Sequence, residues 1–252
     1  MSVASDITRV STSEIMIVTM ARMLDGLRHV AVGASSPVPG SAALLTRARS
    51  KGYTRVSILG SRKNNPFTDG ARELFDCAGQ GRIDAFFLSG GQIDGQANIN
   101  LVGIGEHPGT KARFPGSFGS AHLYFIVPRV ILFREEHTPR VLVDKVDFVS
   151  APGVSPPEVY RPGGPYALVT GLAVFRFDRT TARFTLESAH PGVTAGQVRE
   201  ATGFDYDAPA EVPVTPTPDA ATLALLRGPV AEAVAETYPA FAARTWGVSL
   251  PT

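Results

Sequence analysis

Apolar and polar residues follow one another in short blocks along the first third of the chain. Ser11 and Glu14 have the spacing of a helix capping box, and apolar residues follow at roughly helical intervals from Ile15 to Leu24. Downstream, nearly continuous apolar runs alternate with segments of helical pattern. The runs predict strands at 29–32, 55–59 and 83–88, and the helical segments lie at 39–50 and 69–79. Strands that are apolar throughout are typical of a parallel sheet covered on both faces.

The second half of the chain is richer in strand patterns and ends in helices. Residues 151–165 contain five prolines and three glycines and predict a surface loop, because the strand pattern resumes after them. Thr217 and Pro218 have the residue types of a helix N-cap and a first helical position. The expected strands are 123–127, 130–133, 141–143, 148–149, 167–170, 173–177 and 183–188, and the expected helices are 219–227 and 230–244.

These elements predict an α/β fold: a doubly wound, mainly parallel sheet with a strand-rich second half. The chain has 252 residues, 44% of them hydrophobic, which is enough to bury a full core. We therefore expect a single domain over residues 1–252, with a helical tail from about residue 218 to residue 252.

Composition narrows the classes of partner and compartment. The chain carries 24 basic and 23 acidic residues, so its net charge of +1 predicts neither a nucleic acid nor a membrane as partner. Its one cysteine, Cys77, cannot form an internal disulfide, which fits a reducing compartment. The N-terminus lacks the pattern of a secretion signal, and no apolar stretch approaches the roughly 20 residues of a membrane span. We expect a soluble, cytoplasmic protein.

Common catalytic and cofactor motifs are not found in the sequence. There is no P-loop and no G-x-S-x-G elbow, and Pro108 follows Gly103-Ile-Gly105 where a dinucleotide fingerprint needs a further glycine. The five histidines are scattered without metal-ligand spacing, so we expect no metal site. The cluster Glu135-Glu136-His137 follows a predicted strand and is interpreted as a solvated turn.

Two glycine-rich segments attract attention instead, at 89–100 (SGGQIDGQANIN) and 111–120 (KARFPGSFGS). In each, a predicted strand or basic-aromatic step runs into a glycine-containing turn with polar side chains, and Gly90 and Gly91 of the first segment are adjacent. Such turns let the backbone approach a ligand closely and point N–H groups at an anion, for example a thioester oxygen that gains negative charge. Turns of this kind also occur with no function, and these segments alone do not decide between the two interpretations.

The order and spacing of the motifs resemble the β-subunit of class I, glutaconate-type CoA-transferases. The resemblance extends over about residues 12–230. It rests on the two glycine-rich segments and on four further motifs at 144–153, 168–175, 190–194 and 202–205. It implies the NagB/RpiA/CoA-transferase-like fold and an α-type partner subunit in a heterodimer or heterotetramer. It also implies an acyl-CoA thioester as substrate at the subunit interface, with no permanently bound cofactor.

The resemblance also assigns candidate residues. Gly116 and Gly119 match a turn whose backbone amides contribute to an oxyanion site, although Phe118 stands where many members have glycine. The substrate-binding candidates at the strand end near the CoA pocket are Gly90, Gly91, Gln92, Asp94 and Asn98. For Asp94 and Asn98, capping of a turn through side-chain bonds to the backbone is an equally open interpretation.

One position departs from the family pattern. Transferases of this class use a glutamate nucleophile at the end of an early strand. Here the strand at 55–59 is followed by GSRKNN at 60–65, and the nearest downstream carboxylates are Asp69 and Glu73. The loss of a covalent nucleophile costs roughly 10⁴–10⁶ in rate, which argues against a transferase of the covalent type. The sequence therefore resembles those relatives of the family that lack this glutamate.

Three functions follow from this departure. The first is hydrolysis or C–C bond cleavage of a CoA thioester. The second is a true CoA-transferase whose carboxylate lies elsewhere, and the third is a non-catalytic scaffold that completes the pocket of the α-subunit. Ser61, Arg62 and Lys63 then become candidates for binding a substrate carboxylate or a CoA phosphate, with a solvated basic turn as the alternative.

Overall fold

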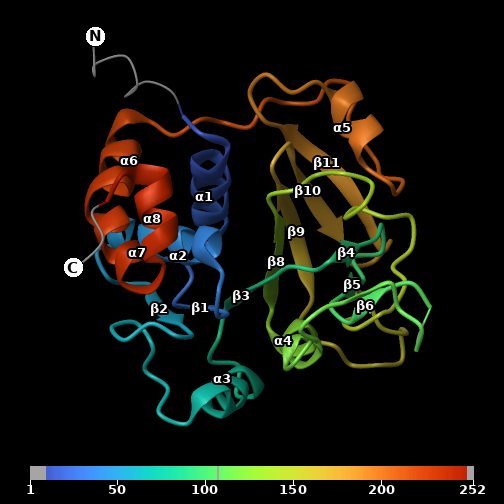
Figure 1. Cartoon of the computed structure of the whole chain (residues 1–252), viewed down its shortest axis with the longest axis horizontal. Coiled ribbons are helices and arrows are strands. Elements are labelled where there is room, and N and C mark those ends of the chain that lie inside the picture. Colours follow the sequence, from blue (N-terminus) through green and yellow to red (C-terminus); the bar gives the residue numbers. More distant parts are fainter. Residues whose placement is uncertain (1–9, 107, 249–252) are drawn as a thin grey trace.

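A seven-stranded sheet forms the centre of the molecule, in the order β11-β10-β9-β8-β3-β1-β2 (Figure 1). The computed structural model describes residues 10–106 and 108–248. The strands of this sheet are β1 (His29–Val32), β2 (Arg55–Ile58), β3 (Ala85–Leu88), β8 (Arg129–Arg134), β9 (Pro165–Thr170), β10 (Ala173–Asp178) and β11 (Arg183–Ala189). Two small hairpins pair β4 (Gln92–Ile93) with β5 (Ile99–Asn100), and β6 (Gly103–Ile104) with β7 (Ala112–Arg113).

Helices cover the sheet and connect its strands. They are α1 (Thr12–Met23), α2 (Pro37–Arg49), α3 (Gly70–Gly79), α4 (Ser120–Ile126), α5 (Ala195–Ala201), α6 (Ala220–Leu225), α7 (Ala231–Thr237) and α8 (Pro239–Trp246). The predicted capping box is present, since the Ser11 hydroxyl accepts from the Glu14 amide while the Glu14 carboxylate accepts from the Ser11 amide.

The sheet is parallel from β2 through β1, β3 and β8 to β9, and β10 and β11 then add antiparallel strands. This arrangement confirms the predicted α/β fold with a mainly parallel sheet. The chain passes from β1 to β2 on one side and then to β3 on the other side of β1. In sheets of this type, ligands bind outside the carboxyl ends of the strands where the strand order reverses.

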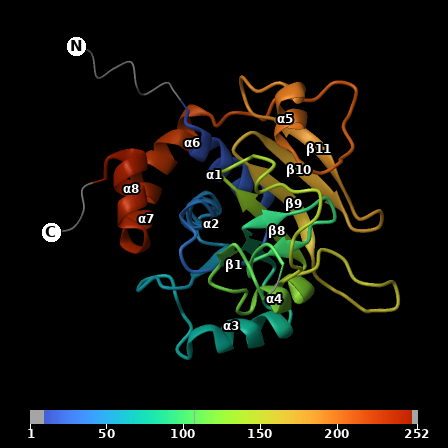
Figure 2. The same cartoon turned by 45° about the vertical axis from the view of Figure 1, so that its right-hand side comes forward.

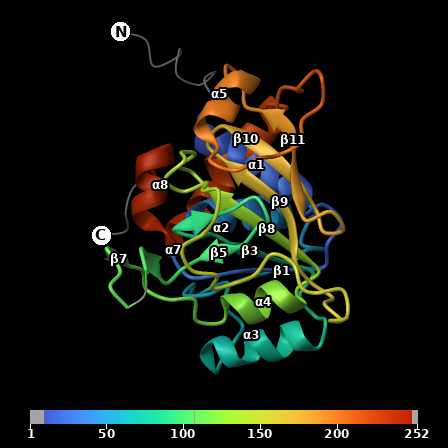
Figure 3. The ribbon, with the colours of Figure 1, turned by 90° about the vertical axis from the view of Figure 1, so that its right-hand side faces the viewer.

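Alternate side chains of the strands face two separate hydrophobic cores. In β3, Phe87 packs with α1, α2 and the C-terminal helices, whereas Phe86 and Leu88 pack with α3, α4 and the β4–β5 hairpin. Figure 2 shows α7 and α8 on the same side of the sheet as α2, and Figure 3 shows α3 lying beside α4. Both faces of the sheet are therefore covered, which is why its strands are apolar throughout.

Three predicted strands are wrong. Residues 123–127 belong mostly to α4, in which Leu123 and Tyr124 are buried, because a short apolar run does not distinguish a strand from one buried helical turn. Residues 141–143 make only one isolated bridge, from Leu142 to Ile93, and 148–149 form no strand. Helix α5 was not predicted, although its capping box of Thr194 and Gln197 was visible in the sequence.

The bounds of the C-terminal helices differ from those predicted for the two helices at 219–227 and 230–244. Asp219, not Thr217, is the N-cap of α6, and its carboxylate accepts from the Thr222 amide at 2.7 Å. A kinked turn around Gly228 and Pro229 joins α6 to α7. The predicted helix 230–244 is two helices, because Pro239 starts α8 directly after α7. The end of the predicted tail, 249–252, and residues 1–9 lie outside the described residues.

A buried ion pair ties this C-terminal region to the first helix. The Arg227 guanidinium donates to both carboxylate oxygens of Glu14, at 2.6 and 3.0 Å, and only 4% of the Glu14 side chain is exposed. Burial alone would raise the pKa of Glu14, but its hydrogen bonds to Arg227 and Ser11 outweigh burial and lower it. The C-terminal helices are thus fixed to the core.

His137 is not on a solvated turn, as the sequence suggested. Its ring is buried, with Nδ1 2.7 Å from the Thr170 hydroxyl and Nε2 2.9 Å from the Thr202 hydroxyl. Since the Thr202 hydroxyl donates to the Val198 carbonyl, it accepts from His137 Nε2–H. Burial, with a smaller contribution from His190, lowers the pKa of His137 to about 4, so this histidine is neutral at pH 7.

Candidate active site

A cleft of about 350 Å³ opens at the carboxyl ends of the parallel strands. Gly33 and Ala34 enter it directly after β1, Leu59 after β2 and Ser89 after β3, and Phe133 reaches it from β8. The cleft therefore lies at the point where the strand order reverses, which is the expected ligand site of an open α/β sheet.

The opposite wall of the cleft is the turn at 116–119, together with part of α3. The described residues that line the cleft are apolar apart from its serines, and none of them is Asp, Glu, His, Lys, Arg or Cys. The serines are Ser36, Ser89, Ser117 and Ser120. A site of this composition can bind and orient an acyl group, but it has no side chain of its own that can act as acid or base near neutral pH.

Gly116 and Gly119 both lie in this cleft, for different structural reasons. Gly116 has a φ of +102°, and its amide donates to the Leu101 carbonyl at 3.0 Å. Gly119 has no room for a side chain, because a Cβ atom there would lie 2.1 Å from the Phe75 ring. Within the described chain, the amides of Ser117, Phe118 and Gly119 have no hydrogen-bond partner. The turn can therefore offer N–H groups from 117–119, whereas the Gly116 amide is already engaged.

The segment after β2 forms a closed turn that a distant carboxylate holds in place. The Ile58 amide donates to the Asn64 carbonyl at 2.8 Å. Glu236, from α7, accepts from the Ser61 hydroxyl at 2.6 Å and from the amides of Arg62 and Lys63 at 2.7 and 3.3 Å. Burial would raise the pKa of Glu236, but these hydrogen bonds and one from the Thr237 hydroxyl outweigh burial and lower the pKa.

The structure places the candidates Ser61, Arg62 and Lys63 outside the lining of the cleft. Ser61 is buried under Glu236, whereas Arg62 and Lys63 are exposed and form no ion pair with a described residue. Glu236 itself was missed by sequence reasoning, because nothing in the sequence links it to a loop 175 residues earlier.

The polar side chains among the substrate-binding candidates at 90–98 make hydrogen bonds that hold the β4–β5 hairpin and its turn. The Asp94 carboxylate accepts from the amides of Gln96 and Asn98 at 3.1 and 3.0 Å, and from the Asn98 side chain at 3.1 Å. Gln92 accepts from Asn100 at 2.7 Å and from the Asp147 amide at 3.0 Å. Hydrogen bonds of this kind are expected if Asp94 and Asn98 cap the turn.

The glycines before this hairpin are required by close packing. A Cβ atom at Gly90 would lie 2.6 Å from Ile99, and one at Gly91 would lie 2.2 Å from the Phe114 ring. Neither glycine lines the cleft, although the preceding Ser89 does.

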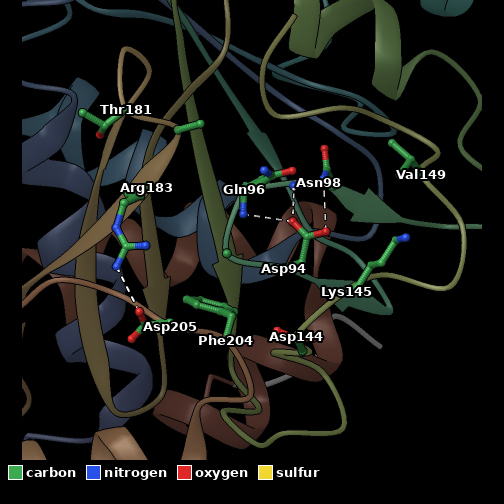
Figure 4. A pocket seen from close by; sticks show the side chains of 12 residues that line it. Asp94, Gln96, Asn98, Asp144, Lys145, Val149, Thr181, Arg183, Phe204 and Asp205 are labelled. Atoms are coloured by element: carbon green, nitrogen blue, oxygen red, sulfur yellow. Dashed lines mark hydrogen bonds and ion pairs between the residues drawn. The ribbon is translucent and has the colours of Figure 1, made fainter.

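Asp94 and Asn98 line a second cleft, of about 500 Å³, together with residues from three other segments (Figure 4). Lys145 lines it from the loop after Asp144, and Arg183 faces it while paired with Asp205 at 3.1 Å. The structure thus separates the predicted site residues: Gly116 and Gly119 lie in the first cleft and Asp94 and Asn98 in the second.

Neither a metal cluster nor a membrane span occurs over residues 10–106 and 108–248. No three His, Cys, Asp or Glu side chains in this part of the chain are placed to hold a metal ion together. No helix in it is both long and apolar enough to cross a bilayer.

Known proteins resemble the chain in sequence and in fold. Residues 13–201 match the sequence profile of the family described as Coenzyme A transferase. The chain belongs to the coenzyme A transferase family. It is 31% identical over 243 residues to the B subunit of 3-oxoadipate CoA-transferase from Pseudomonas knackmussii, an alignment that covers 86% of this chain and 92% of the relative.

Proteins named for other reactions are similar as well. The cholesterol ring-cleaving hydrolase IpdB subunit of Rhodococcus jostii is 33% identical over 160 residues, which cover 62% of each chain. The crystal structure of Rhodococcus jostii RHA1 IpdAB superposes with a TM-score of 0.77 and 26% identity, over 88% of this chain and 94% of that one. The decarboxylase AibA/AibB shares the fold, with a TM-score of 0.75 and 24% identity over 90% and 99% of the two chains.

Proposed function

We propose that the chain is the B-type subunit of a heteromeric enzyme that hydrolyses a CoA thioester or cleaves a C–C bond in its acyl group. The observation that carries this proposal is the cleft at the carboxyl ends of the strands, whose described lining contains no ionisable side chain. A transferase of the covalent type needs a carboxylate nucleophile at this place. Relatives named as a hydrolase and as a decarboxylase support chemistry other than transfer.

The carboxylates nearest in sequence to the segment after β2 are engaged in hydrogen bonds or an ion pair and do not line the cleft. Glu73 accepts hydrogen bonds from the Thr68 amide and hydroxyl, and Asp69 pairs with Arg72 at 2.8 Å. Glu236 is bound to the turn after β2. None of these three lines the cleft. We infer that the glutamate nucleophile is missing from this chain.

The turn at 117–119 supplies the catalytic contribution of this subunit in our proposal. Its unpaired amides, together with the strand ends, would bind the thioester oxygen as it gains negative charge, as an oxyanion or as an enolate. The acid and base would come from an A-type partner subunit that closes the cleft. The strand-end residues Gly90, Gly91 and Gln92 keep the neighbouring hairpin in place.

CoA transfer is the second candidate function. It is favoured by the 31% identity to the 3-oxoadipate CoA-transferase chain, which extends over most of both proteins. A non-catalytic scaffold subunit is the third. The kinetics of a Gly119→Ala variant distinguish a catalytic contribution of this chain from a scaffold, and a search for a CoA adduct on the chain distinguishes transfer from the other reactions.

Assembly with a partner is the first expected outcome. Co-expressed with its A-type partner, the chain should elute as a heterodimer or a dimer of heterodimers and turn over an acyl-CoA, whereas the chain alone should be inactive. The reason is that its own cleft lacks an acid and a base. Size-exclusion chromatography with light scattering, followed by a thiol assay for released CoA, measures both. A monomer with full turnover by itself would contradict the proposal.

Arg62 and Lys63 are proposed to bind a phosphate of the CoA moiety, outside the lining of the cleft. Both are exposed cations without an ion pair in the described chain, on a backbone that Glu236 fixes. An Arg62→Ala, Lys63→Ala double variant should raise KM for acyl-CoA about tenfold, by the loss of charge-assisted hydrogen bonds, with the heteromer intact. Unchanged kinetics would instead make this segment a solvated basic turn. Lys51→Ala, which removes an exposed cation elsewhere, serves as the control.

A further inference from the structure

We propose that the first cleft takes an apolar, uncharged acyl group, aliphatic or alicyclic, that carries no second carboxylate. This inference rests on the proposed function, because it assigns the acyl part of the CoA thioester to the cleft at the strand ends. Its basis is the chemistry of the walls.

Half-buried apolar side chains form much of these walls. Leu59, Phe75, Leu101 and Phe133 are partly exposed and line the cleft. The polar contribution comes from serine hydroxyls and backbone amides, which are neutral. A space of about 350 Å³ is within the range of small-molecule sites and has room for an acyl chain of several carbons. Apolar walls gain free energy when they bury such a chain.

The charged and imidazole side chains near the cleft along the chain are either paired or exposed outside its lining. Arg72, next to Ala71, pairs with Asp69 at 2.8 Å, and Arg62 and Lys63, which follow Leu59, are exposed and do not line the cleft. Arg134, which follows Phe133 in β8, pairs with Glu136 at 3.6 Å. Arg47 donates to the Asn64 side chain at 2.8 Å. His122 stands edge-on to Phe75, with ring centroids 5.7 Å apart, and lines a separate surface depression rather than the cleft.

A carboxylate at the far end of the acyl group would therefore lose its water without gaining a counter-charge from the described lining of the cleft. An unpaired ion in apolar surroundings is strongly disfavoured. Glutaconate and 3-oxoadipate, which give two relatives their names, are dicarboxylates. This chain has a cleft suited to the opposite preference.

The test compares two CoA thioesters of equal carbon number on the intact heteromer. Hexanoyl-CoA ends in a methyl group and adipoyl-CoA in a carboxylate. We expect hexanoyl-CoA to bind at least about 100-fold more tightly by isothermal titration calorimetry, because the effective penalty for burying an unpaired ion is several kcal/mol. Each compound is titrated as its dethia analogue, in which a CH2 group replaces the thioester sulfur, so that it binds without being hydrolysed and the result does not depend on the reaction class.

A variant reverses the preference if the inference is correct. Leu59→Lys places a cation in the cleft and should raise the affinity for adipoyl-CoA about tenfold or more while lowering that for hexanoyl-CoA. Tyr53→Lys is the matched control, since it adds the same charge at an exposed position outside the cleft and should leave both affinities unchanged.

Each outcome decides the question. Equal or tighter binding of adipoyl-CoA by the unmodified heteromer overturns the inference but leaves the proposed function standing, and it would show that a cation outside the described lining reaches the acyl group. If an intact heteromer binds neither thioester, the proposed function falls, and the inference falls with it. A preference for hexanoyl-CoA that Leu59→Lys does not alter would also overturn the inference, because the selectivity would then arise outside this cleft.

Discussion

Replacing Gly119 by alanine is expected to lower kcat for the CoA thioester by roughly 10²–10³, the effect of removing one oxyanion donor. The added Cβ atom would lie 2.1 Å from the Phe75 ring, so the ring or the turn at 117–119 must move. A movement of the turn would displace the unpaired amides, and a movement of the ring would change the wall of the cleft beside them. Steady-state kinetics of the heteromer, together with thermal unfolding, measure the effect.

Gly79→Ala is the control for this variant. Gly79 ends α3, has an ordinary φ and has open space around its missing Cβ, so alanine should leave both activity and stability nearly unchanged. If Gly119→Ala lowers the midpoint of unfolding but leaves kcat per folded molecule intact, the turn is only a structural element. The proposed role of its amides would then be wrong.

Acidification from pH 7 to pH 5 is expected to reduce the free energy of unfolding by about 2 kcal/mol through His137 alone. Its pKa falls from 6.5 to about 4 on folding, so the unfolded chain binds the proton first. The stability that neutral His137 contributes is complete above pH 6.5 and is lost as the pH falls toward 4. Protonation would add an N–H at Nδ1 that faces the Thr170 hydroxyl, which already accepts from the amides of Leu172 and Ala173.

Urea unfolding at several pH values tests this expectation with two variants. His137→Gln should lose most of the slope between pH 7 and pH 5, with a remainder from His29 and His190, whose pKa values burial also lowers. His122→Gln, at an exposed position, should keep the slope of the unmodified protein. Carboxylates such as Glu14, with lowered pKa values, lose their contribution only below about pH 4.5 and so act outside this window. Equal slopes in all three proteins would contradict the assignment.

The sequence predicted those elements whose local signals agree with their tertiary surroundings. β1 was predicted with its bounds because the run His29–Val32 is apolar and buried on both faces. α1 was predicted because its capping box needs only Ser11 and Glu14, three residues apart. α4 was mistaken for a strand because its surroundings, not its short apolar run, decide its conformation.

The candidate site shows the same division. The glycine-rich segment at 111–120 indicated a turn at a ligand site, and the structure sets that turn across from the ends of β1, β2 and β3. The sequence did not indicate that the Gly116 amide is engaged with Leu101, nor that Glu236 holds the turn after β2. Both depend on contacts between distant parts of the chain, for which a single sequence carries no local pattern.

The central claim is that this chain processes a CoA thioester without carrying CoA on a carboxylate. The most direct test is intact-mass spectrometry of the heteromer after incubation with hexanoyl-CoA and reduction with borohydride, alongside an assay for consumption of the thioester. A glutamyl- or aspartyl-CoA thioester would be reduced by borohydride, and incubation without the reductant would show the CoA adduct itself. We expect an unmodified mass for this chain in either case, and consumption of hexanoyl-CoA where the reaction is hydrolysis, because the described lining of its cleft has no carboxylate. A CoA adduct on Asp69, Glu73 or Glu236 would contradict the account and identify the protein as a true CoA-transferase.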